Sequence, residues 1–143
     1  MTSSNLSNLA RIGKLKVELP AQSELQGLLR SGRIRLADAR NTANALESRF
    51  DLAYNAAHSL ALAALRWHGF RSEDRYLVFQ ALEHTLGFEY AKWKVLDNFH
   101  RVRNRCEYEG VLDVTEAQVA ELIAVTEDVL RGVDRLGPLA PGK

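Results

Sequence analysis

The chain has 143 residues, of which 46% are hydrophobic and 26% are charged, and its formal net charge is +1. This composition is typical of one globular domain whose core is large enough to fold without disulfides or a structural metal. The small net charge argues against a surface that binds polyanions everywhere, so any nucleic-acid binding would depend on a local basic patch.

Two features of the sequence predict a cytoplasmic protein with no membrane partner. Cys106 is the single cysteine, so no internal disulfide can form, which is typical of a reducing compartment. The N-terminus does not resemble a secretory leader, and no run of about 18 apolar residues predicts a membrane span.

Charge is unevenly distributed along the chain. Residues 1–50 contain eight Lys or Arg against four Asp or Glu, whereas residues 111–143 contain three against six. Blocks of opposite sign favour self-association, but in a folded chain they can also be intermixed.

Residues 1–22 are predicted to form a flexible, basic arm. The segment is rich in Ser and Asn and is interrupted by Gly13 and Pro20. Arg11, Lys14 and Lys16 make it basic, so it either contacts a polyanion or only keeps the protein soluble.

Two helices are predicted between residues 23 and 67. Ser23 is a suitable N-cap for the first, whose apolar residues recur every three or four positions as far as Leu46, with a weak point at Ser31-Gly32. Ser48 followed by Asp51 resembles a capping box and predicts the start of the second helix.

Three further segments are predicted to be helical. Residues 72–74 form an N-terminal signal for a helix that Gly87 ends. Another helix is predicted over residues 88–106, and the last runs from a capping box at residues 115–118 to Gly137. No segment alternates long enough to predict a strand.

This pattern predicts an all-α fold, an antiparallel bundle of four to five helices joined by short turns. The bundle is expected to occupy residues 23–137 as a single domain, with a flexible tail at residues 138–143. Cys106 falls on the apolar stripe of its helix and is expected in the core.

Reactive side chains are densest near the end of the fourth predicted helix. They are His100, Arg101, Arg103, Asn104, Arg105, Glu107 and Tyr108. Arg101 and Arg105 share one face, whereas Arg103 leans toward the apolar side, where a guanidinium needs a carboxylate or phosphate partner. If Asp51, Glu89 or Glu107 is that partner, Arg103 and Asn104 serve only to tie helices together.

Several kinds of site are not predicted. The sequence contains no glycine-rich phosphate loop, no nucleophile elbow and no pair of cysteines. The four histidines never occur in a known metal-binding spacing, so neither a metal nor a cofactor is expected.

The run Arg103-Asn104-Arg105-Cys106-Glu107-Tyr108, preceded by the helical segment 51–60, resembles the HEPN superfamily of small all-α domains. The similarity in helix order and length covers residues 23–136. It implies a homodimer in which the arginine motifs of two subunits face a shared cleft. Many members are metal-independent ribonucleases, often the toxin of a toxin–antitoxin pair or part of an antiviral system.

The sequence departs from the family motif at one position. In the family, a polar residue such as Asn follows the arginine, and a histidine follows after four to six residues; Arg103 and Asn104 match this start, but Tyr108 replaces the histidine. Tyrosine, with a pKa of about 10, is a poor base near neutral pH, whereas histidine, at about 6.5, is a good one. His100 or Glu107 would have to take its place.

Helix geometry adds a condition. Arg103 and Tyr108 are about 140° apart on a continuous helix, so they converge only if the helix ends near Cys106 or if a second subunit supplies one of them. Gly110 is a possible site for an early end.

Two functions are therefore expected as alternatives. The first is a homodimer that binds RNA or a nucleotide in a cleft lined by Arg103, Asn104 and Tyr108 and acts as a toxin-type endoribonuclease; Asp51 and Asn55 would orient the arginine. The second is a non-catalytic module that binds a protein, such as an antitoxin or a nucleotidyltransferase, through apolar residues at a helix corner. These are Trp67, Phe70 and Tyr76, although Trp67 and Phe70 are also expected to be buried at the bundle end.

Overall fold

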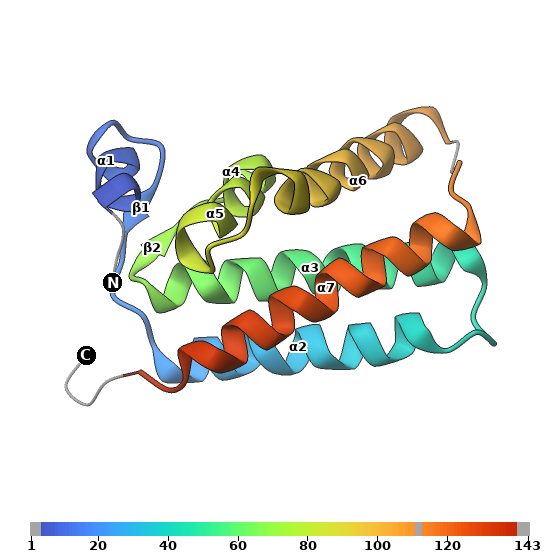
Figure 1. Ribbon diagram of the computed structural model, residues 1–143, viewed down its shortest axis with the longest axis horizontal. Coiled ribbons are helices and arrows are strands. Elements are labelled where there is room, and N and C mark those ends of the chain that lie inside the picture. The colour runs from blue at the N-terminus through green and yellow to red at the C-terminus, as the bar shows by residue number, and fades with distance from the viewer. Residues whose placement is uncertain (1–3, 111–112, 140–143) are drawn as a thin grey trace.

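The computed structural model describes residues 4–110 and 113–139 of the chain. The elements are α1 (Ser4–Arg11), β1 (Lys16–Val17), α2 (Gln22–Arg40), α3 (Leu46–Trp67), β2 (Phe70–Arg71), α4 (Arg75–Gln80), α5 (Leu82–Thr85), α6 (Tyr90–Glu109) and α7 (Glu116–Leu136). The prediction of an all-α helical bundle is confirmed (Figure 1). None of the helices in the described ranges is long and apolar enough to cross a membrane.

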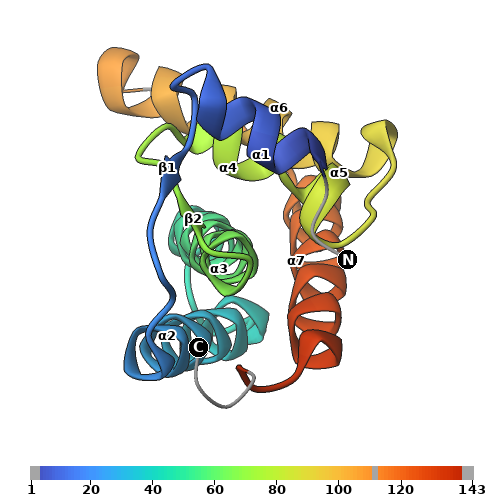
Figure 2. The ribbon, with the colours of Figure 1, turned by 90° about the vertical axis from the view of Figure 1, so that its left-hand side faces the viewer.

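The central helix of the bundle is α3. It packs against α2 and α7 on one side and against α4 and α6 on the other. Seen end on, α2 lies below α3 and α7 lies beside it, while α4, α5 and α6 form a layer above (Figure 2). Six alanines between residues 53 and 64 are buried along α3, and their small side chains let the neighbouring helices approach closely.

The α2 helix is unbroken, so the predicted weak point at Ser31-Gly32 is wrong. Gly32 is buried where α2 meets α3, and a Cβ added there would lie 2.6 Å from side-chain atoms of Leu60. The glycine therefore permits close packing rather than a bend. The helix ends at Arg40 instead of Leu46, because the side chains of Asn41 and Asn44 bond to nearby backbone groups and form a turn.

Two predicted helix starts are wrong and two are confirmed. Ser23 and Ser48 both lie inside helices that begin one or two residues earlier, without a side-chain cap. The Asp74 carboxylate, in contrast, accepts hydrogen bonds from two amides at the start of α4. Thr115 and Gln118 form the predicted capping box of α7. The third predicted helix is divided in two at Ala81.

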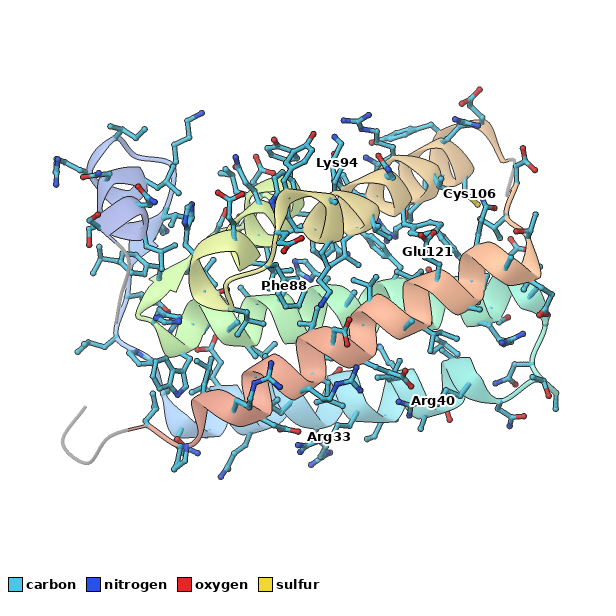
Figure 3. All side chains as sticks on the ribbon, in the orientation of Figure 1. Arg33, Arg40, Phe88, Lys94, Cys106 and Glu121 are labelled. Atoms are coloured by element: carbon cyan, nitrogen blue, oxygen red, sulfur yellow. The ribbon has the colours of Figure 1, made fainter. Side chains whose placement is uncertain are left out.

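The charge blocks of the sequence are intermixed in the fold. Arg33 and Arg40 of α2 pair with Asp134 and Glu127 of α7. Figure 3 labels both arginines along the α2 side of the bundle. The positive block of residues 1–50 thus meets the negative C-terminal segment within one chain, so the charge blocks are no evidence for self-association.

Residues 4–22 do not form the predicted flexible arm. Leu6 and Leu15 are buried in the same core as the helices of the bundle. β1 pairs antiparallel with β2, with Lys16 opposite Arg71. The prediction failed because each of these contacts is made with residues far away in the sequence, which local composition does not reveal.

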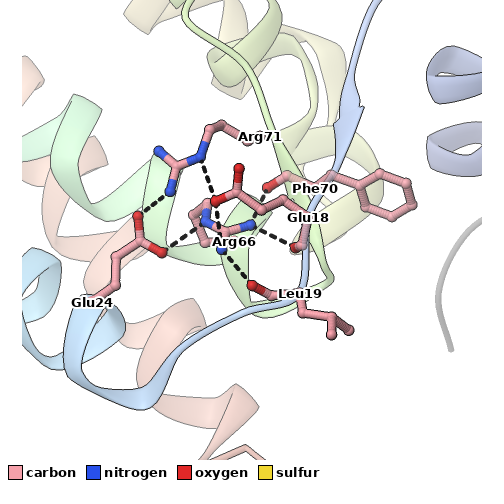
Figure 4. A network of polar contacts seen from close by, with 6 residues as sticks. All are labelled: Glu18, Leu19, Glu24, Arg66, Phe70 and Arg71. Carbon is pink, nitrogen blue, oxygen red and sulfur yellow. Dashed lines mark hydrogen bonds and ion pairs between the residues drawn. The ribbon is translucent and has the colours of Figure 1, made fainter.

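A buried arginine anchors this N-terminal segment (Figure 4). The Arg66 side chain is 1% exposed and donates to the backbone carbonyls of Glu18, Leu19 and Phe70. Its Nε lies 2.9 Å from a carboxylate oxygen of Glu24. A buried guanidinium is tolerated when its donors are satisfied in this way, so Arg66 fixes β1 and the following residues to the end of α3.

Candidate functional site

A polar cluster surrounds Tyr54 where α3, α4 and α6 meet. The Tyr54 side chain is fully buried, and its hydroxyl oxygen lies 2.8 Å from Nδ1 of His100. Two guanidinium groups lie over the tyrosine ring, with the Cζ of Arg103 at 5.2 Å and that of Arg75 at 5.4 Å from its centroid. Such cation–π contacts hold both arginines beside one aromatic ring. We call Tyr54, Arg75, His100, Arg103 and Asn104 the Tyr54 cluster.

Both ring nitrogens of His100 have neighbours in this cluster. Nε2 lies 3.3 Å from the amide nitrogen of Asn104, one helical turn further along α6. With the amide in this orientation it can only donate, so Nε2 accepts and the proton of the neutral ring lies on Nδ1, which donates to Tyr54. The bond to Asn104 is the longer and weaker of the two.

The cluster keeps His100 neutral. Burial lowers the pKa of His100 below its ordinary value of 6.5; Asp97 opposes this shift, and the positive charges of Arg75 and Arg103 reinforce it. An imidazole with a lowered pKa is unprotonated at pH 7 and is able to accept a proton.

The same positive charge acts on His58, one turn beyond Tyr54 on α3. Burial is the main cause that lowers the pKa of His58 to about 4, and Arg75, His100 and Arg103 each lower it further. The His58 ring packs edge-on against Phe79, with centroids 6.1 Å apart. His58 is therefore a neutral packing residue beside the cluster.

Arg103 has a carboxylate partner on its own helix. Its Nη2 lies 3.1 Å from a carboxylate oxygen of Glu107. Of the three carboxylates predicted as alternative partners of Arg103, the structure thus confirms Glu107. The Arg103 side chain is 23% exposed, but its Nε is buried and has no acceptor in the described part of the chain. An unsatisfied buried donor costs about 1–3 kcal/mol, and a ligand reaches this nitrogen only if the surrounding side chains move.

Arg75 was missed by the sequence analysis. It forms no ion pair with a carboxylate of the described residues, and its Nη1 is likewise buried without an acceptor. One signal was available in the sequence: Arg75 follows the N-cap residue Asp74, where the helix dipole disfavours a cation. A cation in such a place indicates a partner elsewhere in the fold, here the Tyr54 ring.

The structure does not bring the other predicted residues of α6 into the cluster. Because α6 continues to Glu109, the side chain of Tyr108 points away from Arg103 and is 87% exposed. Arg101 pairs with Asp97 at 3.1 Å. Arg105 faces Glu109 at 4.0 Å, and both of these side chains are mostly exposed.

Asp51 and Asn55 do not orient Arg103 through any hydrogen bond in the structure. The Asn55 amide donates to the backbone carbonyl of Asp51 within α3. Asp51 and Arg103 nevertheless line one cavity of about 480 Å³ between the start of α3 and the end of α6. Cys106 also lines this cavity and is half-buried, so the expectation of a core cysteine is wrong.

The predicted protein-binding residues lie at the other end of α3. Phe70 is buried, as one alternative expected, and the half-buried Trp67 donates from its indole to the carbonyl of Gly137. Both line a mainly apolar cavity of about 720 Å³ together with exposed residues of the N-terminal segment. Tyr76 is not part of this cavity; it is 39% exposed and packs edge-on against Trp93.

The chemistry of the Tyr54 cluster suits an anion. Within the described ranges, no three His, Cys, Asp or Glu side chains are placed to hold a metal ion. Two guanidinium groups beside a neutral imidazole instead match the charge and the acceptor oxygens of a phosphate. Comparisons of the chain with protein-family models, curated proteins and solved structures found no match.

Proposed function

We propose that this protein binds RNA or a nucleotide through the Tyr54 cluster, in a cleft completed by a second copy of the same HEPN-like bundle. The observation that carries the proposal is the presence of two arginines from different helices on one buried tyrosine, with a single carboxylate paired to them. Two positive charges thus have one carboxylate between them, and phosphate oxygens are the acceptors that arginine binds best.

The proposal extends to metal-independent cleavage, with His100 in the role of the missing motif histidine. His100 Nε2 would accept the proton of the 2′-hydroxyl once the Asn104 amide turns aside. The 2′-oxygen then attacks phosphorus, and the bond to the 5′-oxygen breaks, with a proton supplied by solvent. Arg103 would stabilise the negative charge of the intermediate. The products are a 2′,3′-cyclic phosphate and a free 5′-hydroxyl.

Cleavage is tested by incubating purified protein with mixed RNA in EDTA and analysing the new ends by mass spectrometry. Wild type should leave 2′,3′-cyclic phosphates, and Arg103→Ala should not. Arg105→Ala is the matched control, since it removes an arginine from the same helix outside the cluster. Equal cleavage by Arg103→Ala would exclude the site.

The shared cleft predicts a dimer in solution. Sedimentation velocity over a range of protein concentrations should give a species of twice the mass of the 16.0 kDa chain. A monomer at every concentration that still binds RNA would exclude the second copy while leaving the Tyr54 cluster as the binding site.

A second candidate function is a non-catalytic module that binds a protein such as an antitoxin or a nucleotidyltransferase. It is favoured by the apolar cavity at Trp67, beside which Val17 and Leu19 are 76% and 81% exposed. Exposed apolar side chains around a cavity often mark a protein-binding surface. The test is co-purification with the product of a neighbouring gene, which Leu19→Asp should abolish. RNA binding without such a partner would favour the first function.

A further inference from the structure

The hydroxyl of Tyr54 is a polar group in a place where packing alone would accept a phenylalanine. The tyrosine is fully buried and contacts the rings of Phe50 and Phe79, with centroids 6.4 and 6.0 Å away. A phenylalanine would fill the same space and make the same aromatic contacts. A buried hydroxyl needs a hydrogen-bond partner, and that of Tyr54 lies 2.8 Å from Nδ1 of His100 on α6. The hydroxyl therefore has a role beyond packing, and this role involves His100.

Two contacts with Tyr54 fix the imidazole of His100. Besides the hydrogen bond, the two rings are stacked, with 19° between their planes and 6.3 Å between their centroids. Tyr54 belongs to the buried core, so α3 provides a rigid reference for a side chain of α6. Arg103 lies over the same ring, with its Cζ 5.2 Å from the centroid. The proposed base and the proposed cation are thus both held against one side chain.

The hydrogen bond to Tyr54 also determines which nitrogen of His100 carries the proton. In a neutral imidazole, the bond made by one nitrogen decides the protonation of the other. Nε2 lies 3.3 Å from the amide nitrogen of Asn104, which is a donor, so the proton belongs on Nδ1, where the oxygen of Tyr54 accepts it. In the opposite arrangement the hydroxyl donates to Nδ1, and two donors face each other between Nε2 and Asn104. Only the first arrangement leaves Nε2 able to accept a proton.

Tyr54 differs from the carboxylate that orients a catalytic histidine in many hydrolytic enzymes, because it is neutral. Burial raises the pKa of Tyr54 above its ordinary value of 10, although Arg75 and Arg103 oppose this shift. A neutral acceptor orients the imidazole without adding a negative charge that would favour its protonated form. The hydroxyl is thus suited to hold a base that must stay unprotonated.

We propose that Tyr54 is a positioning residue for His100: its oxygen holds the proton of the resting imidazole on Nδ1 and keeps Nε2 free to accept the proton of the 2′-hydroxyl. Once Nε2 has accepted that proton, the bond from Nδ1 to Tyr54 remains, and the imidazolium keeps its orientation. Because Tyr54 is fully buried, it acts through His100 and not on the RNA itself. This inference rests on the proposed function and adds the residue through which α3 controls the base on α6.

The position of the proton is measured by nitrogen-15 NMR of protein labelled at histidine, near neutral pH and without RNA. Wild type should show His100 protonated at Nδ1 and unprotonated at Nε2, with the signals assigned by their loss in His100→Gln. In Tyr54→Phe both nitrogens should shift toward intermediate values, because the ring then exchanges between its two tautomers. A proton on Nε2 in wild type, or an unchanged spectrum in Tyr54→Phe, would overturn the inference. The wild-type spectrum needs no variant, so it tests the tautomer even where Tyr54→Phe is unstable.

Cleavage kinetics separate the orientation of the base from the binding of RNA. Tyr54→Phe keeps the aromatic ring that holds Arg75 and Arg103, so the KM for RNA should equal that of wild type. The kcat should fall about tenfold, because the base loses one hydrogen bond. A purely structural role would instead lower the thermal midpoint and leave the kcat of the folded protein unchanged.

Tyr90→Phe is the matched control. It removes the hydroxyl of a tyrosine that is 60% exposed, at the start of α6 and outside the Tyr54 cluster. Its kcat, its KM and the tautomer of His100 should all match wild type. Thermal unfolding of the three proteins gives the temperature below which each is fully folded, and the kinetics are measured there.

The outcomes separate the inference from the function on which it rests. If wild type cleaves RNA and Tyr54→Phe has the same kcat, Tyr54 does not position the base, and the proposed function stands. If wild type does not cleave RNA, the proposed cleavage is wrong, and the two NMR spectra alone decide whether Tyr54 holds the proton of His100 on Nδ1.

Discussion

Arginines lie against two regions of α3, its C-terminal end and the turn around Tyr54, and they are held in opposite ways. At one end, Arg66 is 1% exposed and every nitrogen of its guanidinium has an acceptor from the backbone or from a carboxylate. Around Tyr54, Arg75 and Arg103 share one aromatic ring, and each has a buried nitrogen without an acceptor among the described residues. Removing a satisfied buried arginine leaves its partners unpaired and destabilises the fold, whereas removing an arginine with unsatisfied nitrogens leaves fewer partners unpaired.

The largest effect is expected from Arg66→Met. The substitution leaves the Glu24 carboxylate without one of its two arginines and frees the carbonyls that hold the N-terminal segment. Glu24 keeps Arg71 as a partner, so the main loss is the carbonyls left without a donor, which cost about 1–3 kcal/mol each in the free energy of unfolding. Urea denaturation measures this loss. Arg33→Ala, which breaks an exposed pair with Asp134, is the control and should cost less than about 1 kcal/mol. Similar losses of stability for both variants would contradict the structural role of Arg66.

Arg103→Ala should reduce RNA affinity more than stability, the opposite of Arg66→Met. We expect RNA affinity to fall at least tenfold, because a charge-assisted contact to phosphate contributes about 1.5–3 kcal/mol. Stability should change by less than about 1 kcal/mol, because the ion pair to Glu107 is partly exposed. Anisotropy and thermal unfolding of the same preparation measure both quantities. A large loss of stability with unchanged RNA affinity would make Arg103 a structural residue like Arg66.

The two regions should lose stability in different pH ranges. His58, whose pKa is lowered to about 4, is neutral in the folded state while the unfolded chain protonates near 6.5. Stability should therefore fall as the pH drops from about 6.5 toward 4, and His58→Leu should remove this part of the dependence. Urea denaturation at a series of pH values measures it; an unchanged profile for His58→Leu would contradict the assignment.

Glu24 should affect the stability of the fold at lower pH than His58 does. Burial raises the pKa of Glu24, but the hydrogen bonds and charges of Arg71 and Arg66 outweigh it, so that the pKa is lowered from 4.5. A carboxylate with a lowered pKa stabilises the fold above 4.5 and loses this contribution as the pH falls through its folded value. In Glu24→Gln the stability below pH 4.5 should vary less with pH than in wild type, again by urea denaturation.

The smallest effect is expected from Arg105→Ala. Arg105 and Glu109 are exposed and 4.0 Å apart, so the pair should contribute no more than about 0.5 kcal/mol. Neither thermal unfolding nor RNA affinity should change measurably. A clear loss of RNA affinity would move the binding surface from the Tyr54 cluster to the outer face of α6.

Features that depend on neighbours in the sequence were predictable. The capping box of α7, the cap at Asp74 and the glycine ends of α3 and α6 follow from local hydrogen bonding and from positive φ angles at Gly69 and Gly110. Gly110 could also have predicted that α6 extends past Cys106, which turns Tyr108 away from Arg103. Local patterns thus determined most of the helices and the ends at which a side-chain cap or a glycine is present.

Features that depend on distant contacts were not predictable from local patterns. Gly32 looked like a helix breaker because its packing against Leu60 belongs to another helix. The N-terminal segment looked disordered because its partners lie in α3 and β2. Of the site, the sequence indicated Arg103, Asn104 and His100, which share one helix, and missed Tyr54 and Arg75, which join them only through tertiary packing.

The anchoring of the N-terminal segment has a consequence for the order of folding. The Glu18 carbonyl and its donor partner Arg66 are separated by 48 residues, so the segment that contains Glu18 cannot dock until α3 has been made. Until then the apolar side chains of Leu6 and Leu15 have no core to enter. We expect α1 and β1 to be the last elements to gain protection in pulsed hydrogen exchange during refolding, and the first to open in the native protein.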